Sequence, residues 1–113
     1  MELQYSELAS GIRLIKLIGN LDSTGFNSID LKFTGLCAGE NVRVLVDLSG
    51  VSFLASIGIR MLTMNAKSLS SRGGKMVLLN PTEEVRQVLE MTSIPAIIPM
   101  YENFESAEAV VLA

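Results

Sequence analysis

A single serine, Ser56, lies where an apolar strand is expected to end and an amphipathic helix to begin. The strand is predicted over Val42–Asp47 and the helix over Ile57–Ser71, with a short loop of small residues between them. The N-terminus of a helix stabilises negative charge because its first backbone N–H groups are unpaired. Ser56 therefore has two interpretations. It caps the helix by accepting a hydrogen bond from Gly58 or Ile59, or it is phosphorylated and gains about −1.5 to −2 charges.

Other residue types that support catalysis are scarce. The chain has no histidine, which excludes a Ser-His-Asp triad and a zinc site of ordinary composition. Cys37 has no histidine to activate it and is predicted to be a packed, structural residue. Glu83, Glu84 and Glu90 fall on the solvent side of a predicted helix and are weak candidates for acid–base chemistry. We therefore expect no enzymatic activity, no metal site and no cofactor.

The composition predicts one ordered domain over residues 1–113. The apolar fraction of 49%, against 19% charged residues, is typical of a folded chain. A net charge of −3 with few, scattered cations argues against nucleic-acid binding. No apolar run approaches the ~20 residues that cross a bilayer, and the N-terminus lacks signal-peptide features. One cysteine allows no internal disulfide, which fits a reducing compartment, and we expect a cytoplasmic protein. We also expect a monomer or a weak dimer.

Strand and helix patterns alternate along the rest of the chain. Leu3–Leu8 and Leu14–Ile18 are predicted to form an N-terminal hairpin. Apolar spacing predicts a helix over Asp22–Leu36, capped by Asp22, Ser23 or Thr24. The later elements are predicted as a strand over 76–79, a helix that starts at 80–83 with Asn80 as cap, an edge strand within 94–99 and a helix over 105–112. This order predicts an α/β fold with a mixed, mostly parallel β-sheet of about five strands and about four α-helices.

The predicted helix Ile57–Ser71 is more apolar than a surface helix requires. Its core-facing positions are Gly58, Leu62, Ala66 and Leu69. Ile57, Met61 and Met64 lie beside these positions and widen the apolar arc to roughly 220°. Either a neighbouring helix or loop covers this flank, or the flank is a protein-binding edge, for which flexible methionines are well suited.

The order of elements and several motifs resemble the STAS domain, and more narrowly the single-domain bacterial anti-sigma factor antagonists. The matching segments are Gly19-Asn20-Leu21-Asp22, the run from Val44 through Phe53, Ser56-x-Gly58, the run from Arg72 through Leu78 and the run from Val85 through Met91. The resemblance covers nearly the whole chain and implies one STAS domain over residues 1–113 with the STAS fold.

The resemblance implies regulation by partner switching. An unphosphorylated antagonist binds an anti-sigma factor that is itself a serine kinase, phosphorylation of a loop serine releases it, and a serine phosphatase restores it. Carried over by position, the phosphoacceptor is Ser56. The regions that contact the kinase match Asp22 and the helix that starts at Ile57, so the expected partner-binding residues are Asp22, Ser56, Ile57, Met61 and Met64.

The predicted loop departs from the family pattern at two positions. The family's usual loop reads Asp-Ser, then Ser or Thr, then Gly, whereas this chain has Ala55-Ser56-Ile57-Gly58. The loop has lost one acidic residue and one hydroxyl while keeping the acceptor. An alternative function follows from this departure: a STAS scaffold that is never phosphorylated, or a module that binds its protein partner constitutively.

Overall fold

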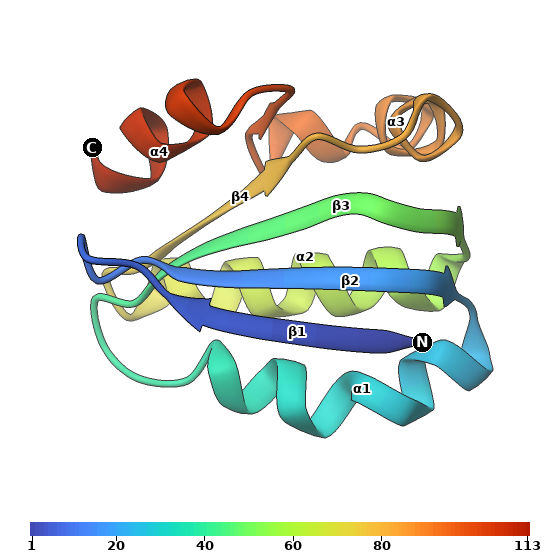
Figure 1. Cartoon of the computed structure of the whole chain (residues 1–113), viewed down its shortest axis with the longest axis horizontal. Helices are drawn as coiled ribbons and strands as arrows, with labels where there is room; N and C mark the ends of the chain where they lie inside the picture. Colours follow the sequence, from blue (N-terminus) through green and yellow to red (C-terminus); the bar gives the residue numbers. More distant parts are fainter.

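The chain folds around a five-stranded mixed sheet, in the order β1-β2-β3-β4-β5 (Figure 1). This arrangement comes from a computed structural model that describes residues 1–113. The strands are β1 (Glu2–Glu7), β2 (Arg13–Leu21), β3 (Arg43–Leu54), β4 (Lys75–Leu79) and β5 (Met100–Tyr101). The helices are α1 (Ser23–Leu36), α2 (Ser56–Ser71), α3 (Glu83–Met91), the short 3-10 helix η1 (Ile94–Ala96) and α4 (Phe104–Leu112).

Only the N-terminal strand pair is antiparallel. β1 pairs with β2 as the predicted hairpin, and the β2–β3, β3–β4 and β4–β5 pairs are all parallel. The α/β prediction of about five strands and four helices is therefore confirmed. Because parallel strands need crossover connections, a helix follows each of β2, β3 and β4.

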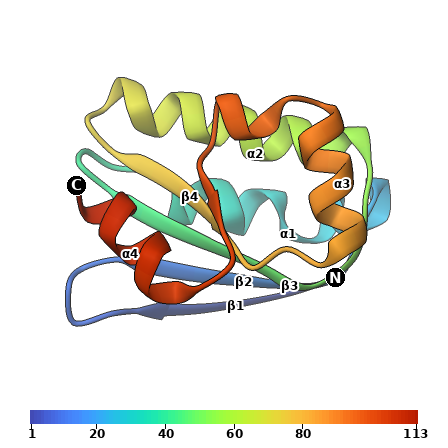
Figure 2. The same cartoon turned by 90° about the horizontal axis from the view of Figure 1, so that it is seen from above.

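The sheet has a thickly covered face and a thinly covered one. Apolar residues of α1, α2 and α3 join β2, β3 and β4 in a core of 22 buried residues. On the opposite face α4 alone packs, and its Ala107 and Val111 meet Leu45, Val77 and Leu79 in a cluster of 6. Figure 2 shows α4 apart from α2 and α3. The three-helix face is the one whose end carries Ser56.

β3 is longer than predicted and contains most of the segment assigned to the loop. It extends to Leu54 because Leu48, Val51 and Leu54 remain buried and the pairing with β2 continues. The register shifts between Lys16 and Ile18, opposite Gly50. A Cβ at Gly50 would lie 3.0 Å from the backbone oxygen of Leu17, so glycine permits this close approach. Polar and small residues in this segment thus belong to an irregular strand, and only Ala55 separates it from α2.

Two predictions for the segment from Asn80 to Pro99 were wrong. Thr82, and not Asn80, caps α3: its Oγ1 accepts from the Val85 N–H at 3.4 Å. Asn80 directly follows β4 in the left-handed region (φ 49°), and its N–H donates to Tyr101 O, so it extends the pairing with β5 and does not start the helix. The edge strand expected within 94–99 is instead η1, with proline in its first turn, and β5 follows it.

Two arginines donate hydrogen bonds to backbone carbonyls at the C-terminal end of α1. The spacing of apolar residues does not predict these contacts. Arg13 donates to Leu36 O at 2.8 Å, and Arg72 donates to Cys37 O at 2.9 Å. Cations at this end satisfy unpaired carbonyls and complement the helix dipole. Because Arg72 is the residue that ends α2, the contact ties α1 and α2 together side by side.

Cys37 is structural, as predicted, and should resist modification in the folded chain. It is buried, and burial raises the pKa of its thiol to about 12. The reactive thiolate is therefore about one part in ten thousand at pH 8. We expect a thiol reagent such as DTNB to react only after denaturation. Rapid labelling of the native chain would contradict this burial.

The same pKa shift makes stability depend on pH in the alkaline range. The unfolded chain releases the Cys37 proton near pH 8.5, whereas the folded chain keeps it to about pH 12. The free energy of unfolding should therefore fall as pH rises through this window. Urea titrations of wild type and Cys37→Ala at several pH values measure the difference.

Candidate functional site

Ser56 is the first residue of α2 and is exposed, but it is not the helix cap. Ala55 occupies the cap position, and its carbonyl accepts the N–H groups of Gly58 at 3.0 Å and Ile59 at 3.2 Å. The capping interpretation of Ser56 was therefore wrong by one residue. No acidic side chain lies in the first turn of α2. The Ser56 hydroxyl thus stands at a helix N-terminus without a carboxylate from that turn to repel a phosphoryl group.

Close packing holds this helix start against the ends of two strands. A Cβ at Gly58 would lie 2.5 Å from Leu21 Cγ and 2.8 Å from Leu54 Cδ1, so only glycine fits between these buried leucines. The Ala55 N–H donates to Leu21 O at 2.9 Å and continues the β2–β3 pairing up to the helix. Ser56 is therefore presented on a rigid support.

Asp22 lies at the same end of the sheet as Ser56. It directly follows β2, whose last residue Leu21 pairs with Leu54 at the end of β3. Its Oδ1 accepts the Gly25 N–H at 2.8 Å, which confirms Asp22 as the α1 cap. One carboxylate oxygen is thus engaged in the fold, and Asp22 and Ser56 begin neighbouring helices.

An apolar groove of about 560 Å³ runs between α1 and α2. We call it the α1–α2 groove; residues that line it include Phe26, Asp30, Ile57, Arg60, Met61 and Met64. The sequence left open whether a neighbouring helix covers the apolar flank of α2. In the structure one part of this flank is covered and another part is exposed. Met61, expected on the open flank, is only 3% exposed, because it packs into the core beneath the groove, whereas Met64 remains 57% exposed. Ile57 is half-buried.

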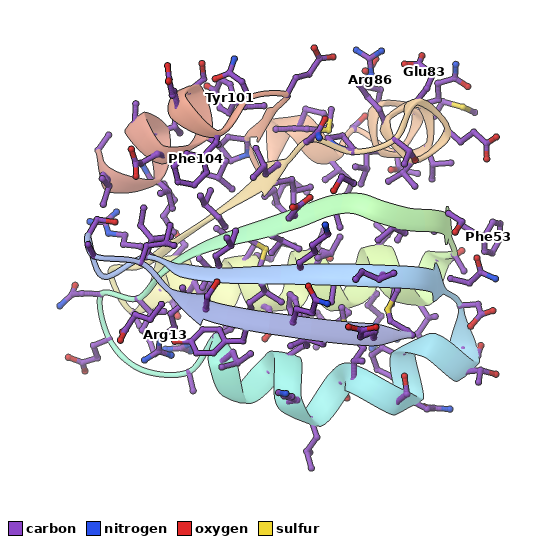
Figure 3. All side chains as sticks on the ribbon, in the orientation of Figure 1. Arg13, Phe53, Glu83, Arg86, Tyr101 and Phe104 are labelled. Atoms are coloured by element: carbon purple, nitrogen blue, oxygen red, sulfur yellow. The ribbon has the colours of Figure 1, made fainter.

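A second hollow, of about 310 Å³, lies between the end of β3 and α3 and was not anticipated from the sequence. Its wall includes Phe53, Leu54, Glu84, Val85, Val88 and Met91. Phe53 is 55% exposed and Met91 is 84% exposed. Figure 3 places Phe53 at the end of the sheet where β2 and β3 finish. The two exposed side chains come from elements far apart in sequence, so no single periodic pattern brings them together.

The outer side of α3 carries an acidic ion-pair network. Arg86 pairs with Glu83 and contacts Glu90 at 3.9 Å and Glu102 at 3.1 Å. Hydrogen bonding to Arg86 lowers the pKa of the Glu83 carboxyl, and Glu83 in turn raises the pKa of Arg86. These groups are exposed, so the network contributes little to stability. As predicted, Glu83, Glu84 and Glu90 are exposed to solvent, and the carboxylates around Arg86 keep this side negative.

No group of three or more cysteine, aspartate and glutamate side chains gathers in a way that suits a metal ion. Among the helices, none combines the length and apolar character that crossing a bilayer requires.

Comparison with known proteins gives a consistent family match. A sequence model described as the STAS domain matches residues 6–107. BtrV from Bordetella bronchiseptica, named as a candidate anti-sigma factor antagonist, is 26% identical over 99 residues, covering 88% of this chain and 85% of BtrV.

Solved structures share the fold over almost the full length. An anti-sigma-factor antagonist (STAS) domain protein from Planctomyces limnophilus superimposes with a TM-score of 0.85 at 23% identity, over 96% of both chains. The anti-sigma factor antagonist SpoIIAA in its unphosphorylated form gives 0.77 at 22% identity, over 96% of both chains. The phosphorylated form of Bacillus SpoIIAA gives 0.71 at 21%, over 96% of this chain and 99% of that one.

Proposed function

We propose, from the premise that this chain belongs to the STAS domain family, that it is an anti-sigma factor antagonist working by partner switching. The observation that carries the proposal is the exposed Ser56 hydroxyl at the rigid start of α2, directly beside the apolar α1–α2 groove. A non-catalytic role is consistent with the family. The names of BtrV and SpoIIAA, and the existence of SpoIIAA in two phosphorylation states, support it.

In its unphosphorylated form the chain binds an anti-sigma factor and so frees the sigma factor. The partner lays an apolar surface against the α1–α2 groove, where the exposed half of Met64 and the half-buried Ile57 provide apolar contact. Asp22 and Ser56 border the same contact from one end of the sheet. Met61 supports the floor of the groove from the core.

Phosphorylation reverses the binding. The partner, acting as a serine kinase, transfers the γ-phosphoryl group of ATP to Ser56 Oγ; the hydroxyl proton is lost and ADP leaves. The phosphoserine adds about −1.5 to −2 charges beside a surface that must be dry in the complex. The partner is released, while the positive end of α2 accepts the charge and the fold persists. A serine phosphatase then regenerates the binding form.

We predict that Ser56→Asp weakens binding to the anti-sigma factor at least about tenfold, or ~1.4 kcal/mol. The fixed charge lies where the complex excludes water, whereas the α2 dipole tolerates it, so thermal stability should be unchanged or slightly raised. Calorimetric titration gives the affinity and circular dichroism the melting temperature. Ser56→Ala is the matched control and should bind like wild type. Unfolding of Ser56→Asp would instead mark Ser56 as a structural residue.

A second candidate, constitutive binding, is favoured by Ala55 and Ile57, which replace the acidic and hydroxyl residues of the family's usual loop. Intact-mass spectrometry after incubation with ATP and the anti-sigma factor distinguishes the two. One added phosphate, absent from Ser56→Ala, supports switching. A stable complex without added mass supports constitutive binding, and a high-order assembly in light scattering supports a scaffold.

A further inference from the structure

Among the arginines of this chain, Arg60 is the one whose side chain has no bonding partner. Arg13, Arg43 and Arg72 donate hydrogen bonds to backbone carbonyls. Arg86 pairs with carboxylates. The guanidinium of Arg60 is exposed and takes part in no ion pair and no hydrogen bond. Because arginine keeps its charge and has five N–H donors, a complete cation is left available at this position.

Arg60 lies one helical turn after Ser56. Both residues belong to α2 and are separated by four positions. Side chains at this spacing are neighbours on the helix surface, with Cβ atoms about 5–6 Å apart. Long side chains on a helix lean toward its N-terminus, so the Arg60 guanidinium can reach a group carried by Ser56 Oγ. Both side chains are exposed, so no buried atom has to move for this contact.

The groups around Arg60 do not already hold it. The lining of the α1–α2 groove contains one cation, Arg60, and one anion, Asp30 of α1. No ion pair joins the two, and Asp30 Oδ1 instead lies 3.4 Å from the Thr34 hydroxyl. In the unphosphorylated chain the lining is therefore electrically balanced, and Arg60 is not committed to the opposite wall.

Phosphorylation of Ser56 changes this balance. A phosphoserine carries about −1.5 to −2 charges and three strong acceptor oxygens, compared with a single negative charge on Asp30. Arginine binds phosphate through two parallel N–H donors, which makes this pair stronger than an ordinary hydrogen bond. The phosphoryl group also lies on the same helix as Arg60, so no movement of α1 is needed. These three differences favour phospho-Ser56 over Asp30 as the partner of Arg60.

We propose that Arg60 pairs with the phosphoryl group of phospho-Ser56 and is thereby drawn out of the α1–α2 groove, an inference that rests on the proposed function. Asp30 is then the one charged residue left in the lining, so the groove becomes acidic. Phosphorylation therefore changes the binding surface twice, by the charge that it adds at Ser56 and by the cation that it removes from the groove.

The test measures the ionisation of the phosphoryl group itself. Phosphoserine is incorporated at position 56 during translation, so that no kinase is needed, and phosphorus NMR follows its titration near about pH 6. A paired guanidinium favours the dianion and lowers the pKa of the phosphoserine. We expect Arg60→Gln to raise that pKa by about 0.3, the size of one exposed ion pair between helix neighbours. Arg60→Lys, which keeps the charge but loses the planar fork, should lie between.

A matched control removes the same charge elsewhere on α2. Lys67 is exposed and lies eleven residues after Ser56, about 16 Å along the helix axis. This exceeds the screening length of about 8 Å at physiological salt, so Lys67→Gln should leave the phosphoserine pKa unchanged. Asp22 and Asp30 on the α1 side and Glu84 on the α3 side are present in every variant, so their effects cancel. About 1 M salt should remove most of the difference between wild type and Arg60→Gln.

Each result has a separate meaning. A phosphoserine pKa raised in Arg60→Gln and unchanged in Lys67→Gln supports the pair. Equal values in wild type and Arg60→Gln, or an equal rise in Lys67→Gln, overturn it while the proposed function stands. Wild type that accepts no phosphate from its anti-sigma factor overturns partner switching, and with it the role of the pair, even where the incorporated phosphoserine contacts Arg60.

Discussion

Met61→Glu should unfold the chain, or lower its free energy of unfolding by several kcal/mol. Met61 is 3% exposed and belongs to the core beneath α1 and α2. A carboxylate placed there loses its hydration and finds no cation among the buried residues, because the core contains no buried polar or charged side chain. Against the ~5–15 kcal/mol of a typical domain, this cost is severe. Urea unfolding followed by circular dichroism measures it.

Met64→Glu is the matched substitution one turn further along the same helix. Its side chain is 57% exposed at the α1–α2 groove, so the new carboxylate stays in water and the melting temperature should change by no more than about 2 °C. Affinity for the anti-sigma factor should nevertheless fall at least about tenfold, since the complex must bury that charge. Loss of stability equal to that of Met61→Glu would make Met64 a core residue, and unchanged affinity would remove the groove from the interface.

The contrast between these two methionines illustrates what periodicity can predict. Spacing correctly placed Leu62 and Leu69 in the core, but Met61 and Met64 share a flank whose coverage depends on α1. α1 follows the adjacent strand β2; its Phe26 lines the groove beside α2, and its far end is held by hydrogen bonds from Arg13 of β2 to Leu36 O and from Arg72, at the end of α2, to Cys37 O. A helical pattern in one segment contains no information about those contacts.

Boundaries were harder to predict than elements, and the site lies at a boundary. The hairpin and the strand–helix alternation follow from local patterns and were confirmed, and of the three candidate caps for α1 the structure selects Asp22. The segment from Leu48 to Leu54 was misjudged because its serines and glycine resemble a loop, whereas the pairing with β2 keeps it a strand. Because of this error, the predicted strand was too short, and the exposed side chain of Phe53 at its end was not anticipated.

Gly58→Ala should destabilise the chain by about 1–3 kcal/mol, because the helix start has no space for a methyl group. The new Cβ would lie 2.5 Å from Leu21 Cγ, a branch point of a fully buried side chain, and 2.8 Å from Leu54 Cδ1. Neither leucine can turn away without opening the core, so the first turn of α2 must lift from the strand ends. Chemical denaturation of the variant gives the difference in free energy.

Gly35→Ala supplies a control of opposite sign. Gly35 lies inside α1, and nothing stands within 4 Å of its Cβ position, so alanine should stabilise the helix by roughly 0.5–1 kcal/mol. The same substitution at Gly58 also moves Ser56, two residues earlier, away from its rigid support. We therefore expect Gly58→Ala, but not Gly35→Ala, to slow phosphorylation of Ser56 as well as to weaken anti-sigma binding. If Gly58→Ala were as stable and as readily phosphorylated as wild type, the close packing of α2 on Leu21 would not be what positions the acceptor.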